Sequence, residues 1–162
     1  MYERARATYD RYAARISLEL VGPTPEQVAA AREDTALFEA ERLYLDVRLL
    51  CESAGEISNQ AAVDYQLGLL YRVQGRGEES LDRLDRALVT FRCVLKPNAR
   101  VHDSISLCHY YIGKALMDRG DIREARRHLK AAIEIDASTG IRHRAKACAS
   151  LLERTRQPQP GR

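Results

Sequence analysis

The chain has 162 residues, of which 45% are hydrophobic and 30% charged, with a formal net charge of +3 at pH 7. This length fits one domain, and the high charge with few aromatic residues excludes a collagen, a transmembrane protein and a small disulfide scaffold. No apolar run approaches the roughly 20 residues that span a bilayer, and the charged N-terminus has no signal-peptide pattern. We therefore expect a cytoplasmic protein without membrane contact.

The front half of the chain is expected to form two helices. Residues 2–20 read as the first. Thr24 is a suitable N-cap for the second, and Gln27 can complete a capping box with it. We expect this second helix to continue without a break to about Ser53, with Gly55 just past its end.

The rear half reads as five further helices, with no stretch that alternates like a strand. Pro97 stops the second of these, Gly120 closes the third, and Asp121 with Glu124 is expected to cap the fourth. Residues 157–162 are expected to be a disordered tail. The expected helices cover approximately residues 58–74, 78–95, 100–119, 121–136 and 139–155.

Two segments of the chain match each other slot for slot at an offset of 45 residues. The first is Leu67-Gly68-x-x-Tyr71-x-x-x-Gly75, followed by Ser80, Leu84 and Ala87. The second is Ile112-Gly113-x-x-Leu116-x-x-x-Gly120, followed by Ala125, Leu129 and Ala132. A partial third copy, Ala40-x-x-x-Tyr44-x-x-Val47, lies 40 residues before Ser80.

The repeated slots have a packing interpretation. Small residues at Gly68 and Gly113, and at Ser80 and Ala125, let the two helices of a hairpin approach closely, while large apolar residues fill the remaining space. Such a hairpin cannot bury its apolar face alone, so hairpins must stack. The residues expected to pack the repeat are Leu67, Gly68, Tyr71, Gly75, Ile112, Gly113, Leu116, Gly120 and Ala125.

This pattern resembles the tetratricopeptide repeat over residues 36–137, although its Trp slot holds Asp64 and His109. The resemblance implies an all-α stack of antiparallel hairpins with about seven helices, forming one domain over residues 1–156. Repeat spacings longer than the usual 34 residues are similar to those of longer-helix bacterial regulators and scaffolds. The helix at 139–155 is expected to cap the stack.

In such a stack the first helix of each hairpin lines a concave groove. The residues expected there are Tyr65, Leu69, Arg72, Tyr110, Lys114 and Met117. They suit an extended or helical peptide with apolar and acidic groups. The alternative is that these side chains are core and rim, covered by the first two helices. Leu69 stands where chaperone-binding members carry Asn, so we do not expect chaperone binding.

Charge is unevenly distributed along the chain. Residues 1–60 carry 7 basic and 11 acidic side chains, and residues 61–162 carry 19 and 12. The asymmetry suggests a homodimer, an acidic partner at the basic rear, or only an uneven solvated surface. The basic rear contains Arg119, Arg123, Arg126, Arg127 and Lys130, then Arg142, Arg144 and Lys146. It has no nucleic-acid motif, so we do not expect nucleic-acid binding.

We find no sequence motif for catalysis, a cofactor or a metal. Cys51, Cys93, Cys108 and Cys148 have no zinc-type spacing and are expected to be free thiols. His128 and His143 could approach each other between neighbouring helices, but the sequence does not place them, and Asp64 and Asp118 give no defensible acid/base pair. We therefore expect a non-catalytic scaffold or adaptor that binds a peptide or protein. The alternatives are a ligand-responsive regulator and a small biosynthetic enzyme or accessory.

Overall fold

The computed structural model describes residues 3, 7 and 24–155. Over 24–155 it contains α-helices and one short π-helix, η1, and no strand. No helix in this part of the chain is long and apolar enough to cross a membrane. The expected helix at 2–20, apart from residues 3 and 7, and the expected tail lie outside the described residues. The elements are α2 (Pro25–Glu33), α3 (Thr35–Ser53), α4 (Ile57–Val73), α5 (Gly77–Val89), η1 (Thr90–Val94), α6 (Ala99–Arg119), α7 (Ile122–Thr139) and α8 (Arg142–Arg154).

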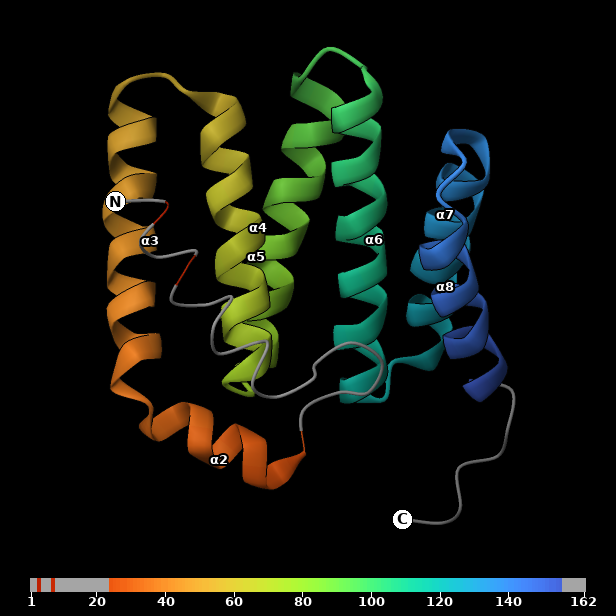
Figure 1. Ribbon diagram of the computed structural model, residues 1–162, viewed down its shortest axis with the longest axis horizontal. Coiled ribbons are helices and arrows are strands. Elements are labelled where there is room, and N and C mark those ends of the chain that lie inside the picture. The colour runs from red at the N-terminus through yellow and green to blue at the C-terminus, as the bar shows by residue number, and fades with distance from the viewer. Residues whose placement is uncertain (1–2, 4–6, 8–23, 156–162) are drawn as a thin grey trace.

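The helices α3 to α8 stand side by side, and α2 lies across one end of the row (Figure 1). The most extensive packing is within two antiparallel hairpins, α4 with α5 and α6 with α7. The first hairpin packs through α5 on α6, and α8 packs on α7. The all-α hairpin stack predicted from the sequence is confirmed.

The glycines of the repeat mark the closest approach within each hairpin. A Cβ atom on Gly68 would lie 2.6 Å from Cγ of Leu84, and one on Gly113 would lie 2.8 Å from Cγ of Leu129. Real side chains do not reach such distances without displacing their neighbours. The two hairpins therefore pack in the same way, through equivalent residues that lie 45 positions apart, as the sequence match predicts.

The expected continuous helix from Thr24 to Ser53 is wrong, because the chain breaks at Asp34. The capping box at the start of α2 is confirmed, with Thr24 and Gln27 each accepting a backbone N–H from the other. Asp34 then leaves helical geometry, and its Oδ1 accepts the backbone N–H of Ala36 at 2.9 Å. An aspartate offers the backbone this second N-cap, which allows α3 to start in a new direction.

The predicted N-cap position of α7 is confirmed at Asp121, but the predicted capping hydrogen bond is not formed. Asp121 makes no capping hydrogen bond to α7, and its carboxylate instead forms an ion pair with Arg119. Arg119 is the last residue of α6, whereas the next basic residue of the rear, Arg123, belongs to α7. Gly120 closes α6 in the left-handed conformation (φ 91°), as predicted.

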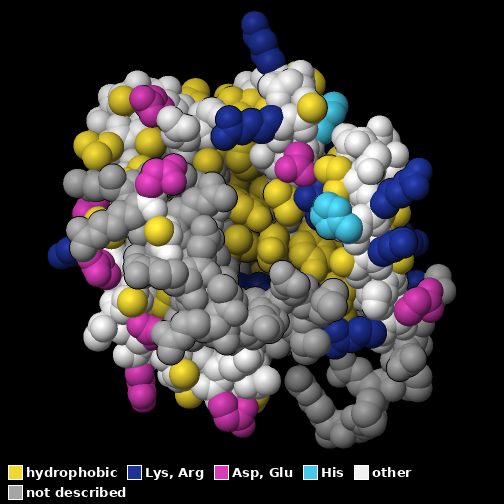
Figure 2. Space-filling model, in the orientation of Figure 1, with side chains coloured by type: hydrophobic (Ala, Val, Ile, Leu, Met, Phe, Trp, Pro, Cys, Tyr) yellow, Lys and Arg dark blue, Asp and Glu magenta, His cyan; other side chains and the backbone are white. Residues whose placement is uncertain are grey.

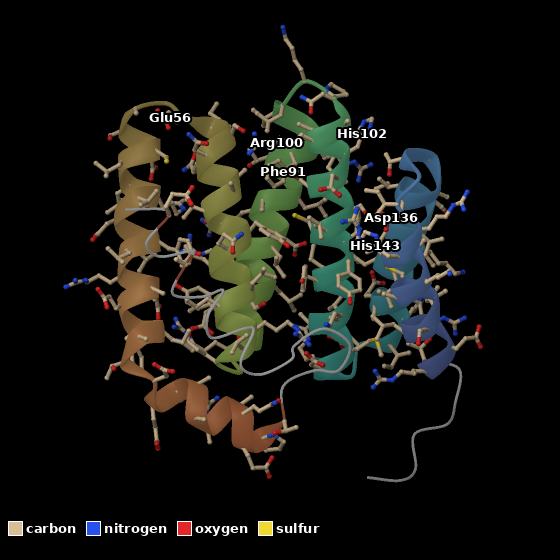
Figure 3. The ribbon with its side chains drawn as sticks, in the orientation of Figure 1. Glu56, Phe91, Arg100, His102, Asp136 and His143 are labelled. Carbon is tan, nitrogen blue, oxygen red and sulfur yellow. The ribbon has the colours of Figure 1, made fainter. Side chains whose placement is uncertain are left out.

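A buried ion pair fastens α8 to the rest of the stack. Asp136 of α7 is 1% exposed, and both its carboxylate oxygens accept the Nε–H of Arg144 at 2.9–3.0 Å. The Ser106 hydroxyl donates to the same carboxylate at 2.6 Å, and Arg144 also donates to Asp103. Figure 3 shows Asp136 between the helices it joins. One carboxylate thus connects α6, α7 and α8.

We expect Asp136→Asn to lower the free energy of unfolding by about 3–5 kcal/mol, because it leaves the buried Arg144 guanidinium without its main counter-charge. Urea unfolding measures this change. The matched control is Asp82→Asn, whose exposed ion pair with Arg86 is expected to contribute less than about 1 kcal/mol. Equal losses in the two variants would contradict a special role for Asp136.

Candidate functional site

The face of the stack seen in Figure 2 is hollowed at its middle, between α4 and α6 on one side and α8 on the other. Hydrophobic side chains gather in this hollow, and Lys and Arg side chains lie on the side of α7 and α8. His102 and His143 lie at its edge and are exposed (Figure 3). We call this surface the inner face, because α4, α6 and α8 form it.

Three tyrosines and a lysine form a cluster between α4 and α6. The ring of Tyr111 meets Tyr65 edge-on at 6.0 Å between centroids, and meets Tyr110 edge-on at 5.0 Å. The Nζ of Lys114 lies 5.2 Å from the centroid of Tyr110 and 5.7 Å from that of Tyr111. Edge-on ring pairs and a cation over a ring face are both attractive arrangements. The cluster joins α4 to α6, and so joins the two hairpins.

Most of the six expected groove residues are buried. Leu69, Arg72, Tyr110 and Lys114 are each at most 7% exposed, whereas Tyr65 and Met117 are half-buried. The structure therefore joins Tyr65, Tyr110 and Lys114 through Tyr111, but it buries both predicted cations, Arg72 and Lys114, as well as Leu69 and Tyr110. The alternative, in which such residues are core and rim, fits these four positions.

Arg72 directs its charge to a residue of the same stack. Its Nη2 donates to Asp118 at 2.7 Å, which joins the C-terminal ends of α4 and α6. Its Nε is buried and has no hydrogen-bond partner among the described residues. The pair borders an open hollow of about 500 Å³, whose other walls include Pro25 and Val28 of α2. The sequence could not predict this contribution of α2, because the break at Asp34 was not foreseen.

A second, smaller cavity lies beside Tyr65. It has a volume of about 70 Å³ and is lined by α4, η1 and α6, with Phe91 and Leu107 among its walls. Phe91 belongs to η1, in which the backbone N–H of Leu95 donates to the carbonyl of Thr90, five residues before it. This wider turn ends the helix that the sequence predicted as continuous to Leu95.

Tyr111 is the functional candidate that the sequence reasoning missed. It is half-buried and lies between Tyr65 and Tyr110. Adjacent residues of a helix point about 100° apart, so the helix face that was assigned to the groove because of Tyr110 did not include Tyr111. The sequence feature that could have indicated Tyr111 is its position next to Tyr110, on the helix that faces the preceding hairpin.

The basic side chains of α7 form an exposed surface on the second helix of their hairpin. Arg123, Arg126, Arg127 and Lys130 line a shallow hollow of about 390 Å³ together with Ile122. Arg127 is paired with Glu124 at 3.0 Å. Of the rear residues expected to be basic surface, Arg144 is buried in the ion pair with Asp136.

The two acids considered as catalytic candidates are both held in ion pairs. Asp64 is 4% exposed, and its Oδ1 accepts hydrogen bonds from Arg48 at 2.9 Å and Arg83 at 2.8 Å. Asp118 is the partner of Arg72. Within the described residues, no cluster of three or more His, Cys, Asp or Glu side chains could hold a metal ion.

The histidine contact in the structure differs from the one that the sequence left open. His128 of α7 contacts His109 of α6, with 3.1 Å between their Nδ1 atoms, and not His143, which is exposed on α8. The sequence alone does not select the histidine pair, because it does not give the rotation of α6, α7 and α8 about their own axes.

Residues 106–138 match the family model of the tetratricopeptide repeat. The second hairpin is therefore a tetratricopeptide repeat. The matched segment runs from Ser106 of α6 to Ser138 of α7, so it coincides with the second hairpin. The first hairpin repeats its glycine contact and its slots. No match was found among curated proteins or among solved structures.

The four cysteines of the chain are free thiols, and only Cys93 is exposed. Burial raises the pKa of the Cys148 thiol to about 12, and raises the pKa of Cys51 and Cys108 above the ordinary value of a thiol. The thiolate is the reactive form, so the three buried thiols should react slowly.

We expect iodoacetamide at pH 7.5 to modify Cys93 rapidly and the other three only after denaturation. Peptide mass spectrometry gives the site of each label. Cys93→Ser should abolish the fast phase, and rapid labelling of Cys148 in the native protein would contradict the buried packing of α8.

Proposed function

We propose that the protein is a non-catalytic interaction module that binds a peptide or a partner protein across the inner face. The observation that carries the proposal is the cluster of Tyr65, Tyr110 and Tyr111 between α4 and α6, the helices through which the two hairpins border the inner face. Tyrosines of this kind give large, rigid contact areas with a polar tip, which suits protein recognition.

The partner is expected to bind mainly through apolar or aromatic groups. Arg72 and Lys114 are buried, and Arg72 is already paired with Asp118, so neither offers an exposed charge. Acidic groups of a partner would find their complement in the exposed Arg123 and Lys130 of α7 instead. A second copy of the chain is one such partner, because residues 1–60 carry more acidic than basic side chains.

The alternatives concern the same surface. A ligand-responsive regulator would change the angle between the hairpins at the Tyr65–Tyr111 contact when a ligand enters. A biosynthetic enzyme or accessory would use the open hollow beside Arg72 as a pocket. Both would act in the cytoplasm, the location that the sequence suggests.

A photo-crosslinking amino acid in place of Tyr65 tests the proposal in cells. We expect it to capture a defined protein adduct, while the same amino acid at Val89, exposed at the end of α5, captures none. Tyr111→Ala should reduce the adduct at least about fivefold, since a well-packed aromatic contact contributes 1 kcal/mol or more to binding. Tyr111→Phe should retain it.

Circular dichroism melts of each variant separate loss of binding from loss of fold. An adduct with twice the mass of the chain would identify the partner as a second copy. Equal capture at positions 65 and 89, or capture unaffected by Tyr111→Ala in a folded variant, would contradict the inner face as the binding surface.

A further inference from the structure

A pair of histidines closes the second hairpin. His109 of α6 and His128 of α7 are both half-buried, with 3.1 Å between their Nδ1 atoms and 5.0 Å between ring centroids. At this distance one ring donates an N–H to the other, so the contact requires that at least one Nδ1 carries no proton. With protons on both Nδ1 atoms, two donors and two positive charges would face each other.

The corresponding contact of the first hairpin has different chemistry. Asp64 and Arg83 lie 45 residues before His109 and His128, respectively, and Arg83 donates to Asp64 at 2.8 Å. The first hairpin is therefore closed by two fixed opposite charges. In the second hairpin the same two slots hold side chains that both become cationic in acid.

The charged groups around the pair come from three elements. Asp85 of α5 and Arg92 of η1 act on it from the neighbouring hairpin, and Glu124 and Arg127 act from α7 itself. Burial, then the neighbouring His128 and Arg92, lowers the pKa of His109 to about 4. Burial also lowers the pKa of His128, although Asp85 and Glu124 oppose this change. The acidic neighbours Asp85 and Glu124 therefore favour protonation of His128 over protonation of His109.

We propose that the His109–His128 pair makes the second hairpin acid-labile: it holds α6 against α7 while at most one of the facing nitrogens is charged, and it forces the helices apart when both rings are protonated. The first hairpin lacks this response. The effect would reach the inner face, because His109 is followed directly by Tyr110 and Tyr111. The inference concerns the hairpin itself and does not depend on the proposed function.

The direction of the pH effect follows from proton uptake. In the unfolded chain both histidines bind protons near their ordinary pKa of about 6.5. In the folded chain the pKa of both rings is lowered, that of His109 to about 4. The unfolded state therefore binds more protons over this range, so stability is full above about pH 6.5 and falls as the pH falls toward 4.

A graft of the first hairpin's pair into the second tests the proposal. His109→Asp combined with His128→Arg copies the Asp64–Arg83 contact, which has no histidine to protonate. We expect the melting temperature of the full chain to fall between pH 7.5 and pH 5.0 by at least about 3 °C more in the wild type than in the graft. Equal decreases would overturn the proposal.

A second variant and a direct titration cover the case of a graft that does not fold. His109→Gln combined with His128→Gln keeps a neutral hydrogen-bonding pair, and it should show the same shallow pH dependence. Proton NMR of the wild type should show that His109 is still largely unprotonated at pH 5.0. Titration of both His109 and His128 with midpoints near 6.5 would overturn the proposal.

Discussion

The close approach of the two helices within each hairpin is the constraint on which the rest of the structure depends. At Gly68 and Gly113 the facing leucines, Leu84 and Leu129, occupy the space where a Cβ atom would stand. This contact fixes the distance and rotation of α4 against α5 and of α6 against α7. Because the contact recurs at the same slots, the hairpins are alike, and the side chains on their faces come into register.

The two hairpins share the same backbone packing but differ in the polar contacts between their helices. The Ser80 hydroxyl donates to the carbonyl of Gly68 at 2.7 Å, whereas Ala125 fills the equivalent slot without a hydrogen bond from its side chain. The closing pair is Asp64–Arg83 in one hairpin and His109–His128 in the other. The backbone packing is therefore shared, while the polar contacts set how each hairpin responds to its surroundings.

Features with a local cause could be predicted from the sequence, and features set by helix rotation could not. Gly120 ends α6 where predicted, because a left-handed residue at that position needs glycine. The break at Asp34 was missed, since an N-cap aspartate inside an apolar pattern looks like an ordinary polar residue. Tyr65 and Tyr110 both contact Tyr111, a residue that the prediction did not include, and the burial of Lys114 depends on neighbouring helices whose rotation no spacing rule supplies.

The most direct test of the account is a double-mutant cycle between Gly113 and Leu129. We predict that Gly113→Ala lowers the free energy of unfolding in urea by about 1–3 kcal/mol through overpacking. Combined with Leu129→Ala, it should cost at least about 1 kcal/mol less than the sum of the single changes, because the added methyl group enters vacated space. Gly77→Ala, with no atom within 4 Å of its Cβ position, is the control. A Gly113→Ala variant as stable as Gly77→Ala, with additive effects at Leu129, would contradict the shared glycine contact.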